Sequence, residues 1–263
     1  MFVLLELTSN VWGNLTGPYG SAENVPALLQ RLKQAYDQET VDALFESYLF
    51  HQNTIYTVTY AAVPYLMQIA CSTNYPEVQH HLFIICGIIE ASRGDSSFPT
   101  ALKILDEHIG ANIYNSYIEA IREMALLGKD VHTYATTLDD NVEKRYVLAA
   151  DATYRGAYRL ADMLLTFVTG DEYIAICPHC KEDVFLWEGA TQAFVQDPVF
   201  VKEQEARKVV PASKFSDMEQ ILLAEQAVLI GEHELVHDLP YLAGEVNCPS
   251  CSVNIQIWSA LLK

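Results

Sequence analysis

Four of the six cysteines of this chain stand in two short pairs of the same form, Cys-Pro-x-Cys. The first pair is Cys177 and Cys180, and the second is Cys248 and Cys251. Two thiolates in such a tight turn can bind one side of a metal ion, and two turns supply the four sulfurs of a tetrahedral zinc site. The sequence therefore predicts one structural Zn²⁺ held by all four side chains, a closed site with no position left for water or substrate.

Strand-like segments flank both pairs. Residues 173–176 precede Cys177 and residues 184–187 follow Cys180, while Val246 precedes the second pair and apolar residues alternate over 253–257 after it. A strand, a Cys-Pro-x-Cys turn and a returning strand form one half of a zinc ribbon. We therefore expect a small β module of the zinc-ribbon type over residues 171–263.

The two halves of that module are far apart in the chain. Residues 181–247 separate them, whereas the two cysteine pairs of a zinc ribbon are usually separated by about 15–20 residues. The separation predicts an insertion, and its centre, at about residues 217–238, has the pattern of a long helix.

A redox role is the main alternative for the first pair. Cys-Pro-His-Cys also occurs in thiol oxidoreductases, where the first cysteine lies at the N-terminus of a helix and is held as a thiolate. Here a strand-like segment follows Cys180, and a redox site would leave the matching second pair unexplained. Paired cysteines in a reducing compartment also favour metal binding over a structural disulfide. The two single cysteines, Cys71 and Cys86, are expected to be buried apolar residues.

The chain before residue 170 has helical periodicity. Apolar stripes with i, i+3, i+4, i+7 spacing begin at Val25 and at Val63, each followed by proline, with an offset of 38 residues that is close to the about 40–47 residues of HEAT-type helical pairs. Residues 1–170 are therefore predicted to form HEAT-like helical repeats in a mainly α protein. Further helices are expected at about 77–92, 98–109, 113–127 and 142–168, with Gly110 and Gly128 as C-terminal stops.

Two parts of the chain resemble a group of bacterial HEAT-repeat proteins. The similarity is carried by Trp12, residues 17–29, His51–Tyr56, residues 61–66 and residues 239–251. Asn53 stands where that group has glycine, so the turn there is expected to differ. The resemblance covers residues 12–70 and 239–258, and it implies a helical-repeat scaffold without established chemistry. Some members of the group look like immunity proteins.

The formal net charge is −18, from 34 acidic and 16 basic residues. A field of this sign repels phosphate, so nucleic acid and anionic membranes are not expected as partners. It accounts for solubility, and it also suits an acidic face that binds a basic protein. The chain has no signal-peptide pattern and no apolar run of membrane-spanning length, so a cytoplasmic location is expected.

One motif favours a different function. His233-Glu234-Leu235-Val236-His237 fits the pattern H-E-x-x-H, in which two histidines on one helix face bind zinc and the glutamate acts as a general base. Such a site needs a third ligand, yet Pro240 and Ala243 stand at the positions of the extended motif. The alternative explanation places both histidines at a helix end, where a cation meets the C-terminal dipole.

Two functions follow from these patterns. The preferred one is a non-enzymatic cytoplasmic protein-interaction scaffold with an acidic binding surface and structural zinc, of which an immunity protein that binds a basic toxin is the most concrete example. The other is a zinc-dependent hydrolase that uses His233, Glu234 and His237.

Overall fold

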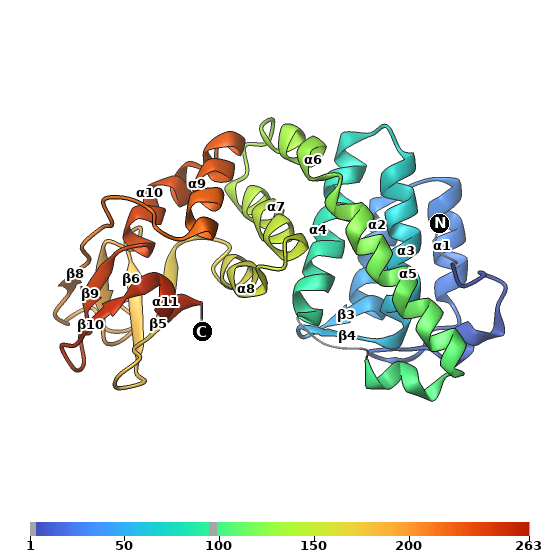
Figure 1. Cartoon of the computed structure of the whole chain (residues 1–263), viewed down its shortest axis with the longest axis horizontal. Helices are drawn as coiled ribbons and strands as arrows, with labels where there is room; N and C mark the ends of the chain where they lie inside the picture. The colour runs from blue at the N-terminus through green and yellow to red at the C-terminus, as the bar shows by residue number, and fades with distance from the viewer. Residues whose placement is uncertain (1–3, 95–98, 263) are drawn as a thin grey trace. The chain divides into compact units, whose positions relative to one another are not determined.

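The computed structural model describes residues 4–94 and 99–262 (Figure 1). The protein is mainly helical, with small antiparallel sheets. It consists of two compact units, residues 1–134 with 150–158 and residues 135–149 with 159–263. Helix α7 (Asn141–Tyr154) therefore contributes to both units. The predicted boundary at residue 170 lies inside the second unit, because α8 (Tyr158–Thr166) belongs to that unit from Arg159 onward.

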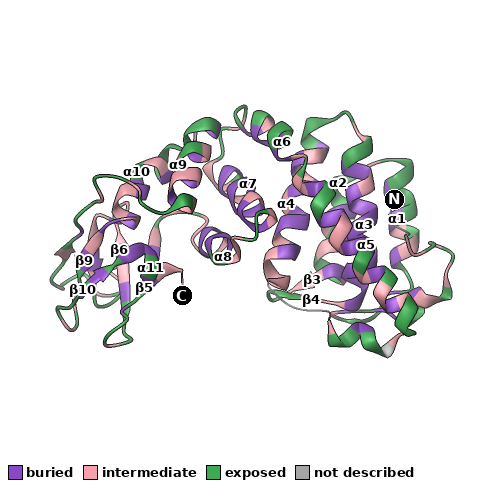
Figure 2. Cartoon of the chain, in the orientation of Figure 1, coloured by how far each residue is buried: buried purple, intermediate pink, exposed green. Residues whose placement is uncertain are grey.

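The first unit is built from helices and two short hairpins. Its elements are the 3-10 helix η1 (Asn10–Asn14), β1 (Thr16–Gly17), β2 (Gly20–Ser21), α1 (Val25–Gln34), α2 (Gln38–Leu44), the π-helical turn η2 (Phe45–Leu49), β3 (Phe50–His51), β4 (Thr54–Ile55), α3 (Thr57–Ser72), α4 (Pro76–Arg93), the 3-10 helix η3 (Thr100–Ile104), α5 (Glu107–Ala125) and α6 (Gly128–Ala135). Helix α3 is buried almost all round because α1, α4 and α5 pack against it (Figure 2).

Helix α4 shows how tightly this unit packs. Its apolar run places Leu82, Phe83, Cys86 and Ile89 completely out of contact with solvent. A side chain at Gly87 would meet Ala150 Cβ at 2.3 Å, so the backbones of α4 and α7 approach closely there. The prediction that Cys86 is buried is confirmed.

The other single cysteine differs from the prediction. Cys71 is exposed, because it lies in the last turn of α3 beyond the part of that helix that its neighbours cover. The sequence could not distinguish the two cysteines, since both stand in apolar helical segments.

Two expected helix ends are also wrong. The predicted helix 98–109, whose first residue lies outside the described residues, is in fact η3 followed by the start of α5. The side chain of Asp106 accepts hydrogen bonds from the amides of His108 and Ile109, so α5 begins there and continues through the buried Gly110. Gly128 begins α6 instead of ending a helix.

A glycine with positive φ ends a helix at a position where no helix end was expected. The predicted helix 142–168 is two helices, α7 and α8, which are separated at Gly156 with φ +82°.

The two Val-Pro dipeptides differ in their position within the helices. Val25 begins α1, whereas Pro64 lies in the middle of α3, so the offset of 38 residues does not relate equivalent helix positions.

The second unit contains the larger sheet. Four antiparallel strands lie in the order β5 (Glu172–Ile176), β6 (Asp183–Trp187), β7 (Gln192–Phe194) and β8 (Arg207–Lys208). A separate hairpin joins β9 (Glu245–Asn247) to β10 (Asn254–Gln256), and α11 (Ile257–Leu261) follows it. A bridge between Val210 and Glu245 links β9 to the chain just after β8. Ile257, which was expected to continue the strand, begins α11 instead.

The inserted segment contains two helices where one was expected at about 217–238. These are α9 (Met218–Ile230) and α10 (His233–Leu242). Gly231 separates them in the left-handed conformation, with φ +69°, and the Lys144 ammonium group donates a hydrogen bond of 2.9 Å to its carbonyl oxygen. None of the helices in the described ranges is long and apolar enough to cross a membrane.

Candidate metal centre

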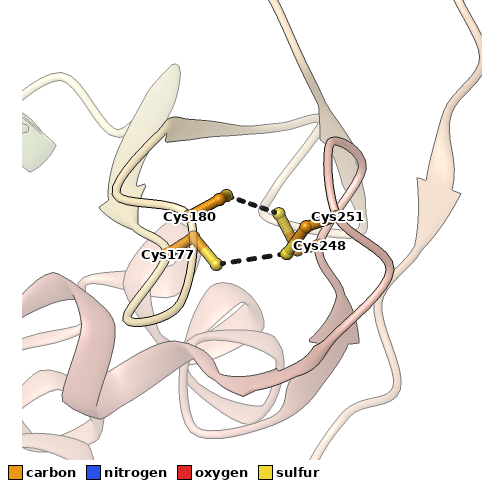
Figure 3. Close-up of side chains that lie close together, drawn as sticks. All are labelled: Cys177, Cys180, Cys248 and Cys251. Carbon is orange, nitrogen blue, oxygen red and sulfur yellow. Dashed lines mark hydrogen bonds between the residues drawn. The ribbon is translucent and has the colours of Figure 1, made fainter.

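The four paired cysteines meet at one point. Each pair lies in the turn of a hairpin, the first between β5 and β6 and the second between β9 and β10, and the side chains point toward one another (Figure 3). All four sulfur atoms lie within 4.8 Å of one another. The sulfurs of Cys177 and Cys251 are 3.8 Å apart, as are those of Cys180 and Cys248. Two turns that are separated by an insertion thus form a single cluster.

The two turns have the same backbone geometry. In the first, the Cys177 amide donates to the Glu182 carbonyl at 3.0 Å and the Lys181 amide donates to the Cys177 carbonyl at 3.0 Å. In the second, Cys248 is bonded in the same way to Val253 at 2.9 Å and to Ser252 at 2.9 Å. The residue after each pair is left-handed, with φ +67° at Lys181 and +61° at Ser252. The match indicates that both turns perform the same role.

Backbone amides also contact the sulfurs. Burial opposes ionisation of Cys177, but hydrogen bonds from the amides of Cys180 and His179 outweigh it and lower the pKa of Cys177 to about 6. Burial raises the pKa of the equivalent Cys248, because desolvation disfavours its thiolate, and hydrogen bonds with the Cys177 and Cys251 side chains raise it further. Four thiolates at one point require a positive ion.

The spacing of the sulfurs fits zinc. Four sulfurs at about 2.3 Å from one tetrahedral ion lie about 3.8 Å from one another, which is the separation of both cross-turn pairs. A disulfide would need about 2.05 Å. Cys177 and Cys248 are completely buried, while Cys180 and Cys251 are partly exposed. The cluster is thus compatible with a zinc site that is closed by four protein ligands.

A thiol oxidoreductase site is not compatible with the first turn. Such a site places its first cysteine at the N-terminus of a helix, where the dipole stabilises the thiolate. Cys177 instead follows strand β5, and strand β6 follows Cys180. The first turn therefore lacks the helix that the redox alternative requires.

The structure places the H-E-x-x-H motif on α10, outside this cluster. His233 is the first residue of α10 and His237 lies one turn later, both exposed. The expectation that the histidines occupy a helix C-terminus is wrong, because Gly231 ends α9 and a new helix starts. Over residues 4–94 and 99–262, the cysteine cluster is the one group of three or more His, Cys, Asp or Glu residues within metal-binding distance of one another. Those described residues therefore supply no third metal ligand to the motif.

The motif does line an open cleft of about 760 Å³ in the second unit. Three segments form its walls, namely residues 169–171 after α8, residues 187–189 at the end of β6 and the first two turns of α10. Of these three walls, the sequence motif H-E-x-x-H indicated only the last. The available signals were the adjacent Gly and acidic residues at 170–171 and 188–189, which mark turns but do not indicate that the turns meet.

A buried polar network lies beneath that cleft. Arg145 Nε donates to Glu232 Oε1 at 2.8 Å, and Arg145 Nη1 donates to the Tyr173 hydroxyl at 3.2 Å. Tyr173 in turn donates to Asp238 Oδ2 at 3.0 Å, and Asp238 Oδ1 lies 3.2 Å from His237 Nδ1. Burial raises the pKa of both Glu232 and Asp238. The network fixes α10 against α7 and β5 within the second unit.

Comparisons with protein families, curated proteins and solved structures found no match to this chain.

Proposed function

We propose that this protein is a non-enzymatic interaction scaffold, in which HEAT-like helices carry an acidic surface that binds a basic protein and one Zn²⁺ stabilises the second unit. The observation that carries the proposal is the closed cluster of Cys177, Cys180, Cys248 and Cys251. With four protein sulfurs, zinc keeps no open coordination position, so the ion has a structural role and not a catalytic one.

The charge of the chain supports a basic protein as the partner. Its formal net charge of −18 attracts cationic surfaces and raises association rates with them, and it disfavours nucleic acid. Four thiolates around Zn²⁺ would add about −2 to this charge. The resemblance to bacterial HEAT-repeat proteins is consistent with a scaffold in the cytoplasm, and an immunity protein that neutralises a basic toxin is the most concrete form of the proposal.

Metal stoichiometry tests the structural part. We expect native mass spectrometry to find one zinc per chain, lost in Cys177→Ser and retained in the double variant His233→Ala/His237→Ala. The matched control is Cys71→Ser, which changes an exposed cysteine outside the cluster and should keep the zinc. Two zinc ions, one of them lost in the histidine variant, would instead support a hydrolase that uses His233, Glu234 and His237.

Salt dependence tests the binding part. The protein is immobilised and exposed to lysate of its native host, and bound proteins are eluted with a rising salt gradient. Because exposed charge pairs are screened over about 8–10 Å at about 0.10–0.15 M salt, a partner recruited by charge should elute as salt rises. We expect a basic protein in the eluate. An acidic or neutral partner that stays bound at high salt would contradict the proposal.

A further inference from the structure

Helix α9 of the second unit is apolar on two opposite faces. The inner face packs through its buried residues, which are Gln220, Leu223, Ala227 and Ile230. The outer face carries five apolar side chains that we call the α9 stripe: Met218, Ile221, Leu222, Val228 and Leu229. At about 3.6 residues per turn, these five positions lie within an arc of about 120°. Met218, Val228 and Leu229 are 73%, 64% and 62% exposed, so most of the stripe is in contact with solvent.

An outer face of this kind is unusual for a helix at a protein surface. Polar residues normally occupy that face, and a helix that is apolar all round is normally covered on all sides. Helix α1 follows this rule, because its last exposed positions hold Gln30, Arg31, Lys33 and Gln34. Contiguous exposed apolar side chains mark a surface that binds another molecule. The α9 stripe is therefore a candidate docking surface.

The charges around the α9 stripe are acidic. Glu225 lies between its two halves and is exposed, and Asp217 caps the N-terminus of the helix. Residues 215–235 contain no lysine or arginine. The Lys144 side chain, which donates to the Gly231 carbonyl at the end of α9, is buried. An apolar partner that docks here therefore gains from carrying positive charge.

These two properties decide between the possible occupants. A second copy of this chain would bring the same apolar stripe, but it would also bring Glu225 and a formal net charge of −18 against equal charges. An anionic membrane is repelled for the same reason. An amphipathic helix with apolar residues on one face and lysine or arginine beside them matches both the stripe and its charge.

We infer that the α9 stripe binds a basic amphipathic helix of the partner protein, with apolar side chains against Val228 and Leu229 and a cation beside Glu225. The inference rests on the proposed function, because the occupant is a segment of the same basic partner. It places one contact of that partner on the unit that zinc stabilises.

A titration with a model peptide tests the apolar part. The probe is a helical peptide of about 14 residues with leucine on one face and lysine on the other, added to the zinc-loaded full chain at about 0.15 M salt. The variant Val228→Gln/Leu229→Gln removes two adjacent exposed apolar side chains from the stripe. The matched control, Val199→Gln/Phe200→Gln, removes another adjacent pair, 55% and 83% exposed, from the segment after β7.

We expect the affinity for the peptide to fall about tenfold in the stripe variant and less than about twofold in the control. Retained zinc and an unchanged circular dichroism spectrum confirm that each variant is folded. Equal losses in the two variants would overturn the inference, because the peptide would then bind without preference for α9.

A second titration tests the charge. Glu225→Gln should weaken binding about two- to fivefold and reduce its dependence on salt, whereas the control Glu203→Gln changes an exposed carboxylate outside α9 and should do neither. The same peptide with glutamate in place of lysine should not bind. Equal binding of the acidic and basic peptides would contradict a basic occupant.

Two further outcomes separate this inference from the proposed function. A wild-type chain that sediments as a dimer, and as a monomer in Val228→Gln/Leu229→Gln, would show that a second copy covers the stripe and would overturn the inference. A basic host protein that binds this variant as tightly as wild type would also overturn it, while the proposed function would stand. If the salt gradient elutes no basic protein, the proposed function is wrong, and the inference with it.

Discussion

Both units bury a charged residue among tyrosines, but they complete its hydrogen bonds differently. In the first unit, Glu90 is 2% exposed and accepts hydrogen bonds from Arg93, Tyr117 and Tyr158, so both of its oxygens have partners. In the second, Arg145 donates to Glu232 and Tyr173, while its buried Nη2 atom makes no hydrogen bond and lies 3.8 Å from Glu234 Oε2. The carboxylate of the first unit is thus more completely hydrogen-bonded than the guanidinium group of the second.

The same contrast holds for packing. Helix α3 of the first unit is enclosed by other helices, and apolar contacts of this kind need no further component. The second unit brings four sulfurs to one point at the end of its hairpins, an arrangement that is unfavourable for thiolates without a cation. The first unit should therefore be stable without a bound ion, whereas the second should depend on one. The following predictions test this difference.

Metal removal should have the largest effect. Structural zinc contributes about 10–16 kcal/mol of apparent binding free energy in small zinc-dependent folds, and much of it is folding free energy. We expect a chelator to expose the amides of β5, β6, β9 and β10 to hydrogen exchange while α3 and α4 keep their protection. Equal protection of the hairpins with and without chelator would show that the sulfurs do not hold them.

The next largest effect is expected from Arg145→Met. It leaves Glu232 buried without its ionic partner, which costs about 3–5 kcal/mol of unfolding free energy. The control, Arg122→Met, removes an arginine that is 69% exposed from a pair with Glu119 and should cost less than about 1 kcal/mol. Urea unfolding measures both. Similar costs for the two variants would contradict the importance of the buried network.

A pH effect should distinguish the first unit. Burial lowers the pKa of His80 to about 4, from an ordinary value of 6.5. The unfolded chain therefore binds the proton more readily, and stability is lost as pH falls from about 6.5 to about 4, by up to about 3 kcal/mol. His80→Phe should remove this part of the pH dependence. The check is the difference in urea midpoint between wild type and variant over that range, and a constant difference would contradict the prediction.

The smallest effect tests the equivalence of the two turns. Lys181 and Ser252 both have positive φ, which glycine adopts without the cost of a Cβ atom, so Lys181→Gly and Ser252→Gly should each stabilise the metal-bound protein by up to about 1 kcal/mol. Thermal unfolding of the two variants gives the comparison. Shifts of opposite sign would show that the turns are not equivalent.

Local patterns in the sequence predicted the cysteine turns well. The form Cys-Pro-x-Cys and the alternating residues beside it depend on neighbours in the chain, and both turns fold as expected. The helix breaks were harder to predict because they depend on which glycine becomes left-handed. Gly110 stays helical inside a well-capped α5, whereas Gly156 and Gly231 end helices.

The cleft could not be predicted from the sequence. Its carboxylates come from three segments that only the folded chain brings together. The motif at 233–237 lies in one wall, but the sequence marked it as a candidate zinc site. Its histidines lack a third ligand among the described residues. Motifs identify chemistry within a turn or a helix, and only tertiary structure shows what lies opposite.

X-ray absorption at the zinc edge on the purified protein measures the ligand shell of the bound ion. Four sulfur ligands at about 2.3 Å, with no nitrogen or oxygen in the coordination shell, are predicted for an ion held by Cys177, Cys180, Cys248 and Cys251. A shell that contains histidine nitrogen or water oxygen at about 2.0–2.1 Å would contradict a closed structural site.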